Sequence, residues 1–309
     1  MRIAITGSTG LVGSAVVEAL LADGHEVVRM ARPSSAQAAR DRDDGTETAS
    51  WDPSTGEIDV EAFGAVEAVV HLAGENVAGG RWTEARRRRI HESRGPATEA
   101  LCRTLAALPQ PPAVLVSASA TGIYGDRGDE QLDERSEPGP SDDFLTRVAL
   151  AWEAGTRPLA EHGTRVVNLR IGIVLDRAGG ALAKMLTPFR LGLGGRLGDG
   201  KHWMSWITRH DLVRVVQRAL TDEQLRGPVL AVAPTPVTNA EYTRTLGKVL
   251  GRPTIFPVPR FALRLLFGDL ADVLLGSQRA RPHRLLEAGF EFAHANLDTA
   301  LTAALGKNA

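Results

Sequence analysis

The sequence predicts an α/β protein with a Rossmann-like, doubly wound parallel sheet and a smaller, mixed C-terminal lobe. Three observations favour this class. Short β-branched segments alternate with longer helical ones as far as about residue 175. A glycine-rich turn joins the first predicted strand to the first predicted helix. The predicted strands are apolar throughout, as expected where helices cover both faces of a sheet.

The first half of the chain supplies most of these elements. Residues 11–22 form a helix, because Val12, Val16, Ala19 and Leu20 share one face and Asp23-Gly24 follows. Two further helical stretches cover residues 83–108, broken near Gly95-Pro96, and residues 142–162. The predicted strands cover residues 2–6, 25–31, 65–73, 114–119 and 165–175, and a third strand in chain order closes at Trp51-Asp52.

The regular alternation fades from about residue 177. Helices at 211–219, 239–250 and 260–275 and a strand at 227–233 predict a smaller, mixed lobe. We therefore expect a nucleotide-binding domain at 1–176 and a substrate lobe at 177–309, whose segments are free to interleave.

Composition excludes several classes of protein. The 309 residues contain 36 Lys and Arg against 37 Asp and Glu, so the balanced charge predicts neither a nucleic-acid nor a membrane partner. The single cysteine, Cys102, excludes an internal disulfide and fits a reducing compartment. His202 and His210 lack partners at ligand spacing, so no metal is expected. With no secretory leader and no membrane-length apolar run, we expect a cytoplasmic protein that acts on a small molecule, and a homodimer remains open.

The turn TGSTGLVG carries the first functional signal. Gly7 permits a sharp turn, Gly10 lets the backbone approach a pyrophosphate, and Gly13 lets the helix lie close to the strand. The free N–H groups at the helix N-terminus then face the phosphates. We expect Thr9, Leu11 and Val12 to contact the cofactor there. This context predicts dinucleotide binding in preference to a purely structural turn.

The end of the second strand selects the cofactor. A carboxylate there would bind the ribose 2′-hydroxyl of NAD(H), whereas an arginine accommodates the 2′-phosphate of NADP(H). The segment VVRMARPSS contains Arg29 and Arg32 and no acidic residue. We expect Arg32 to contact the 2′-phosphate, and the alternative is a solvated surface arginine.

Several segments resemble one family. TGSTGLVG, AGENVAGGRWTEARRRRI, SRGPATEAL, SASATGIYGDRGDE and GGALAKMLTPFRLGLGGRLGDGKHWMSWI resemble the atypical extended short-chain dehydrogenases/reductases known as epimerase family proteins, relatives of nucleotide-sugar epimerases. The resemblance implies a Rossmann-like domain that binds NADP(H). The further cofactor contacts that it implies are Asp52, Leu72, Ala73, Gly74 and Ser117.

The catalytic positions of that superfamily are only partly present. The resemblance implies a strand-end hydroxyl, matched by Ser119, and then a Tyr-xxx-Lys pair, in whose place Phe144 and Val148 stand. Tyr124, one of two tyrosines in the chain, is the alternative proton donor. A buried packing tyrosine with a hydrogen-bonded hydroxyl is the competing interpretation.

Two functions are compatible with the sequence. One is an NADP(H)-dependent oxidoreductase or epimerase-like enzyme with atypical proton donors, and the other is a non-catalytic NADP(H)-binding sensor or scaffold. A charged pocket would favour the enzyme. The residues expected to form such a pocket are Glu75, Asn76, Arg94, Lys184, Trp203 and Trp206, and for the tryptophans the alternative is core packing.

Overall fold

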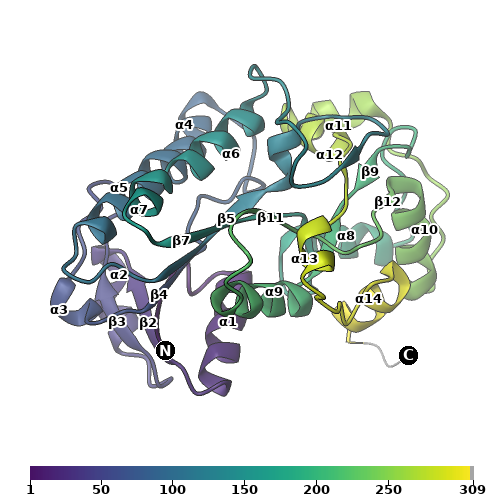
Figure 1. Ribbon diagram of the computed structural model, residues 1–309. Helices are drawn as coiled ribbons and strands as arrows, with labels where there is room; N and C mark the ends of the chain where they lie inside the picture. The colour runs from purple at the N-terminus through teal and green to yellow at the C-terminus, as the bar shows by residue number, and fades with distance from the viewer. Residues whose placement is uncertain (307–309) are drawn as a thin grey trace.

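The computed structural model describes residues 1–306, whose centre is a seven-stranded sheet of parallel strands in the order β11-β7-β5-β4-β1-β2-β3 (Figure 1). The predicted Rossmann-like class is therefore confirmed. The strands are β1 (Arg2–Thr6), β2 (Glu26–Ala31), β3 (Glu47–Ser50), β4 (Ala68–His71), β5 (Val114–Ala120), β7 (Arg165–Ile171) and β11 (Gly227–Ala231).

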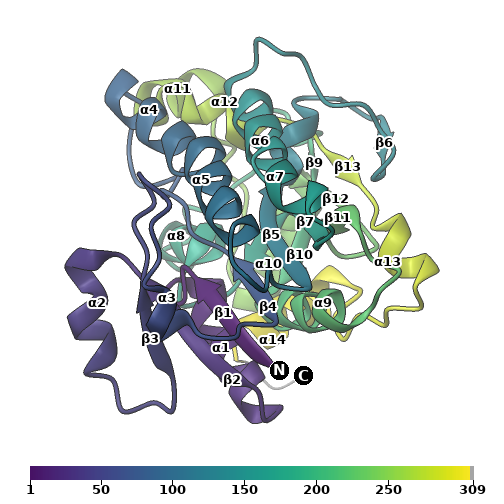
Figure 2. The ribbon, with the colours of Figure 1, turned by 60° about the vertical axis from the view of Figure 1, so that its left-hand side comes forward.

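Helices cover both faces of the sheet (Figures 1 and 2). On one face α1 (Leu11–Ala22) and α9 (Arg209–Thr221) pack together over an apolar core of valine, leucine and isoleucine. On the other face α5 (Gly95–Ala106) contacts α6 (Phe144–Ala154) and α7 (Arg157–Glu161). A second apolar cluster there includes the buried Cys102.

Two predicted elements are divided at glycines where backbones meet. A Cβ at Gly172 would lie 2.5 Å from the Ser205 carbonyl oxygen, and the strand predicted at 165–175 becomes β7 and β8 (Ile173–Leu175). A Cβ at Gly155 would lie 2.9 Å from the Gly95 carbonyl oxygen, and the helix predicted at 142–162 becomes α6 and α7. These glycines allow close packing that a side chain would prevent.

The C-terminal half adds a smaller lobe but also returns to the sheet. Helices α8 (Gly180–Arg190), α10 (Asn239–Leu250) and α14 (Leu297–Ala304) enclose a separate apolar cluster. Helices α11 (Arg260–Phe267) and α12 (Leu270–Leu275) form a further cluster. The assignment of strand 227–233 to the smaller lobe was wrong, because β11 pairs in parallel with β7 at the sheet edge.

The strand order places a crevice beside β1. From β1 the chain builds outward to β2 and β3, whereas β4, on the other side of β1, leads to β5 and β7. Ligands of doubly wound sheets bind at the carboxyl ends of the strands where this direction reverses. Within residues 1–306, no helix is both long and apolar enough to span a membrane.

Candidate cofactor-binding site

The three glycines of the turn after β1 differ in their surroundings. Gly7 has a φ of +67°, and a Cβ on it would lie 2.8 Å from the backbone of Leu72. A Cβ on Gly13 would lie 2.2 Å from the Gly7 carbonyl oxygen. A Cβ on Gly10 would meet only that oxygen, at 3.3 Å, and would otherwise project into open space. Two glycines are thus required by packing, while Gly10 leaves room for a ligand.

Buried side chains hold this turn in shape. The Thr6 hydroxyl accepts hydrogen bonds from the N–H groups of Leu72 and Ala73, at 3.1 and 3.2 Å. Its own hydrogen is then directed to His71 Nδ1, 2.8 Å away, which leaves Nε2–H to donate to Thr98. Complete burial lowers the pKa of His71 to about 4, so the ring is neutral at pH 7.

Arg29 supports the turn from β2. Its Nη1 donates to the Ser8 carbonyl oxygen at 3.0 Å, its Nε donates to Thr46, and Nη2 pairs with Asp44 at 2.8 Å. The side chain is buried and its charge is paired, so Arg29 is a structural cation and is not free to bind a phosphate.

The first turn of α1 presents free donors. Its N-cap residue, Gly10, has no side chain, so no side chain satisfies the N–H groups that follow. The first N–H groups of a helix lack intrahelical partners, and together with the helix dipole they attract an anion. The turn and the helix N-terminus therefore fit the pyrophosphate of a dinucleotide.

A cleft of about 540 Å³ opens over this turn. Its walls come from the turn, one face of α2 (Pro33–Arg40) with the loop after it, and the residues that follow β3 and β4. The lining residues include Gly7, Ser8, Thr9, Gly10, Met30, Arg32, Ser35, Ala38, Ala39, Arg42, Trp51, Pro53, Leu72, Ala73, Gly74, Glu75 and Ser93. The cations, Arg32 and Arg42, come from α2 and its flanks, and the carboxylate, Glu75, follows β4.

Five of the expected cofactor residues, Gly13 among them, lie outside these walls. The Asp52 carboxylate closes a turn by accepting from the N–H and hydroxyl of Ser54, at 2.8 and 2.6 Å. Leu11 packs against Gly179, and Val12 packs against the core beneath α1. Ser117 is fully buried within β5. Their direct contact with a cofactor stays a prediction.

Arg94 lies behind the β4 end of the cleft. Its guanidinium is buried, donates to the carbonyl oxygens of Glu75 at 2.9 Å and Ile90 at 3.2 Å, and stacks 4.8 Å from the centre of the Trp152 ring. It also touches the position where a Gly74 Cβ would lie. Burial lowers the pKa of Arg94 to about 10, so it remains charged at pH 7 and supports this loop from below.

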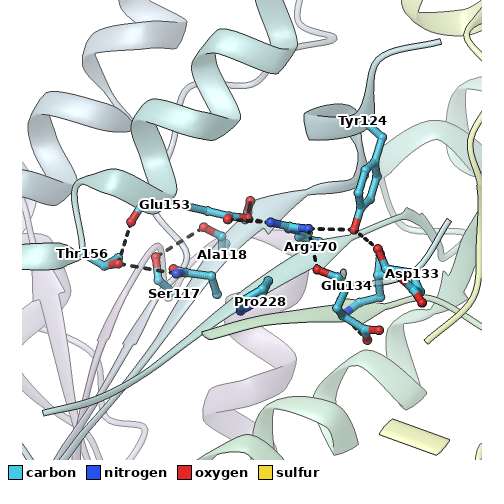
Figure 3. A network of polar contacts seen from close by, with 12 residues as sticks. Ser117, Ala118, Tyr124, Asp133, Glu134, Glu153, Thr156, Arg170 and Pro228 are labelled. Atoms are coloured by element: carbon cyan, nitrogen blue, oxygen red, sulfur yellow. Dashed lines mark hydrogen bonds and ion pairs between the residues drawn. The ribbon is translucent and has the colours of Figure 1, made fainter. Parts of the chain in front are cut away.

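Both predicted catalytic hydroxyls belong to one buried polar network, and Figure 3 shows its members Tyr124, Arg170 and Glu153. Tyr124 is completely buried, and its hydroxyl donates to the Asp133 carbonyl oxygen and accepts from Arg170 Nη1, both at 2.8 Å. Arg170 forms a two-point ion pair with Glu153 at 2.8 and 3.0 Å. The Ser119 hydroxyl donates to the same carboxylate at 2.8 Å.

This arrangement corresponds to the packing interpretation of Tyr124. Burial raises the pKa of its hydroxyl to about 12, against the opposing effect of Arg170. A tyrosine that transfers protons near pH 7 requires the opposite shift. Neither Tyr124 nor Ser119 is among the residues that line the cleft.

The position of the missing tyrosine is occupied by an aromatic cluster. Phe144, at the start of α6, lies edge-on to Trp82, with ring centres 5.2 Å apart. The Arg87 guanidinium, from α4 (Glu84–Glu92), lies 5.0 Å from the Phe144 ring centre and pairs with Asp269. Val148 is buried one turn further along α6.

Of the six residues expected to form a substrate pocket, four (Glu75, Asn76, Arg94 and Lys184) meet at the loop after β4, whereas the two tryptophans lie elsewhere. Glu75 lines the cleft, but Lys184 donates to the Ala78 carbonyl oxygen and Asn76 closes a turn of the same loop. Trp203 Nε1 donates to Asp129 at 2.8 Å. Trp206 is completely buried in the α8–α10–α14 cluster, so its prediction as a pocket wall was wrong and it packs in the core.

Arg42 lines the cleft but was not predicted from the sequence. No helix was predicted at residues 33–40, so the spacing from α2 to Arg42 was not used. Ser35, Ala38 and Ala39 on α2 and Arg42, two residues beyond its end, follow the i, i+3, i+4, i+7 spacing of one helix face. That pattern was the available signal. No group of three metal-ligating side chains occurs in the part of the chain that the structure describes.

Comparison with known proteins gives consistent matches. A family model described as "NAD dependent epimerase/dehydratase family" matches residues 3–233, and a "Domain of unknown function (DUF1731)" matches residues 258–304. An epimerase family protein of Mycobacterium bovis is 42% identical over 97% of this chain and 96% of its own length. The human epimerase family protein SDR39U1 is 36% identical over 97% of this chain and 98% of its own. A crystal structure of human SDR39U1 isoform 2 with NADPH has a TM-score of 0.87 at 34% identity, over 99% of both chains.

Proposed function

Because the chain belongs to the NAD dependent epimerase/dehydratase family, we propose that it binds NADP(H) and catalyses a hydride-transfer reaction without a Tyr-xxx-Lys pair. The observation that supports this proposal most directly is the cleft over the glycine turn, because its α2 side contributes two arginines and no carboxylate. The human relative solved with NADPH supports the choice of cofactor.

The residues of the cleft divide the binding task. The Gly10 turn and the N-terminus of α1 hold the pyrophosphate, and Arg32 at the N-cap of α2 holds the 2′-phosphate. Trp51 and Pro53 border the cleft after β3 and supply apolar contact for the adenine. The bound nicotinamide supplies the hydride chemistry, and the small-molecule substrate stays unidentified.

Proton transfer in this proposal falls to Glu75. It is the carboxylate that lines the cleft, its side chain is 34% exposed, and Arg86 Nη2 lies 3.5 Å from its Oε1. The Tyr124 and Ser119 hydroxyls are occupied elsewhere. Glu75→Gln keeps the shape of the side chain and removes its ability to transfer a proton, and a general acid–base role is worth about 100-fold or more in rate.

The cofactor half of the proposal is tested by calorimetry with NADPH and NADH. We expect tighter binding of NADPH and expect Arg32→Glu to abolish that preference by repelling the 2′-phosphate. Arg40→Glu is the matched control, because Arg40 pairs with the Asp59 carboxylate at 3.3 Å and lies outside the cleft. Equal affinities of the wild-type protein for both cofactors would contradict the proposal.

The second candidate function is a non-catalytic NADP(H)-binding sensor or scaffold. The observation that favours it is the Phe144, Trp82 and Arg87 cluster at the position of the missing tyrosine. NADPH deuterated at the transferable hydride separates the two functions when it is incubated with the protein and a set of nucleotide sugars and carbonyl compounds. Label transfer that Glu75→Gln reduces supports the enzyme, whereas binding without transfer supports the sensor.

A further inference from the structure

The most exposed large apolar side chains gather on two segments of the smaller lobe. Within residues 1–306, seven such side chains are each at least 56% exposed, and the next, Val60, is 52% exposed. All seven lie in residues 191–193 and 255–266, and they are Leu191, Leu193, Ile255, Phe256, Phe261, Leu265 and Leu266. We call these seven side chains the α11 surface. Single exposed apolar residues are common, whereas a concentration of them marks a contact site.

The two segments lie side by side in the fold. The Val258 N–H donates to the Arg196 carbonyl oxygen at 2.8 Å, and the Gly198 N–H donates to the Val258 carbonyl oxygen at 2.9 Å. Helix α11 begins immediately after this pairing and lies at the outer edge of the smaller lobe (Figures 1 and 2). The exposed apolar side chains therefore belong to one continuous part of the molecule.

Helix α11 carries apolar residues on its outer face as well as on its inner one. Leu263 is 2% exposed and packs in the apolar cluster with α12, whereas Phe261 and Leu265 are 74% and 72% exposed. Phe261 and Leu265 are four residues apart and so are neighbours on the same face of the helix. A helix that meets only water on its outer face carries polar residues there. The outer face of α11 thus has the composition of a face that is covered.

Cations surround the α11 surface. Residues 190–198 and 252–268 contain no Asp or Glu and five arginines, which are Arg190, Arg196, Arg252, Arg260 and Arg264. All five are exposed, and within residues 1–306 only Arg264 has a carboxylate oxygen within 4.0 Å, that of Asp272. The bordering Asp269 pairs with Arg87. The net charge of −1 for the whole chain therefore averages over a local excess of positive charge.

We propose that the α11 surface docks onto an anionic lipid bilayer. Phe261 and Leu265 insert at the boundary between headgroups and acyl chains, and the surrounding arginines bind lipid phosphates. Buried apolar area and electrostatic attraction act together in such contacts, and each arginine near an anionic surface adds about fivefold to the affinity. Docking of this kind requires no membrane-spanning helix, because the protein lies on the membrane instead of crossing it.

A second copy of this chain is the competing occupant of the surface. A two-fold symmetric dimer brings the same surface of both subunits together. The five arginines of one copy would then meet the five of the other, and four of them have no carboxylate partner within residues 1–306. Like charges brought together in this way oppose association. The charge of the surface therefore favours an anionic bilayer over self-association.

The proposal is tested by flotation of the full chain with vesicles of phosphatidylcholine, with and without phosphatidylglycerol. We expect binding to the anionic vesicles that is weaker without phosphatidylglycerol and at raised salt, which screens the arginines. The double variant Phe261→Ser, Leu265→Ser should bind about 10- to 100-fold more weakly, because it removes the inserted apolar area. Val60→Ser is the matched control, since Val60 is an exposed apolar residue outside the α11 surface.

A second pair of variants tests the charge. Arg252→Gln combined with Arg260→Gln should weaken binding about 10- to 30-fold on anionic vesicles and have little effect on neutral ones. Arg135→Gln is its control, because Arg135 is also exposed and lies in a different part of the chain. Urea unfolding checks that each variant keeps the stability of the wild type, as expected for changes to exposed side chains.

Three results would overturn the proposal. One is the absence of wild-type binding to the anionic vesicles. Another is equal binding by the wild type and the Phe261→Ser, Leu265→Ser variant. The third is a concentration-dependent dimer in sedimentation that the same two substitutions dissociate, without any vesicle binding, which would assign the α11 surface to a second copy of the chain.

Discussion

Replacing Tyr124 with phenylalanine removes one oxygen atom and keeps the ring, so it tests what that hydroxyl does. In the structure the hydroxyl makes two hydrogen bonds: it donates to the Asp133 carbonyl oxygen and accepts from Arg170. Tyr124 is not among the residues that line the cleft. We therefore expect Tyr124→Phe to reduce stability and to leave NADPH affinity and hydride transfer within about twofold of the wild type.

The expected loss of stability depends on which contacts of Arg170 remain in the Tyr124→Phe variant. Arg170 keeps its two-point contact with Glu153, so its charge stays paired and the cost is below the 3–5 kcal/mol of an orphaned buried charge. One hydrogen bond to a charged group and one to a backbone carbonyl are lost. Such bonds contribute about 1–3 kcal/mol each, and partial relaxation leaves about 2 kcal/mol for the pair.

Urea unfolding measures this loss, and the second tyrosine supplies the control. Tyr242 is 1% exposed, and its hydroxyl is buried and has no hydrogen-bond partner within residues 1–306. Tyr242→Phe should therefore be neutral or slightly stabilising, with the same denaturant slope. Unchanged stability of Tyr124→Phe together with a rate loss of about 100-fold would refute our assignment and restore Tyr124 as a proton donor.

Substitutions in the glycine turn, at Glu153 and at His71 test three further features of the structure. Gly13→Ala should destabilise the protein by about 3 kcal/mol in thermal or urea unfolding, because its Cβ would lie 2.2 Å from a carbonyl oxygen of the turn. Gly10→Ala should stay folded and lose NADPH affinity in calorimetry. Equal stabilities of the two variants would contradict this expectation. Glu153→Gln should cost about 3 kcal/mol in urea unfolding by leaving Arg170 without a carboxylate, and a neutral result would argue against the buried pair. His71 has a folded pKa of about 4 against 6.5 when unfolded, so the unfolded chain binds the proton first and stability should fall by about 2 kcal/mol from pH 7 to about pH 5, a slope that His71→Gln should lack.

The sequence predicted local structure well and distant partners poorly. The bounds of α1 depend on a glycine turn, an apolar face and an Asp-Gly end, all within one short segment, and the structure has the same helix at Leu11–Ala22. The place of β11 depends on pairing with β7 some 60 residues earlier, which no local pattern contains. Its assignment to the smaller lobe therefore failed.

The same division applies to the candidate site. The glycine turn and Arg32 could be identified because their chemistry follows from position after a strand. Tyr124 follows shortly after β5, but its partner Arg170 lies on β7 and Glu153 lies on α6. Only the folded chain brings these three together, and their bonds decide whether the hydroxyl is free to react.

Arg29 has a consequence for anyone who redesigns this protein to use a different cofactor. A common plan would exchange the basic residues at the end of β2 for acidic ones as a group. Arg29 donates a hydrogen bond to the Ser8 carbonyl oxygen and so stabilises the glycine turn. An acidic residue in place of Arg29 would remove this hydrogen bond and destabilise the turn even without a ligand. Arg32 and Arg42 line the cleft instead, so they can be replaced to change the ligand preference. In this chain the cation that shapes the binding loop and the cations available for selecting a ligand are separate residues, and a redesign must keep the first to alter the second.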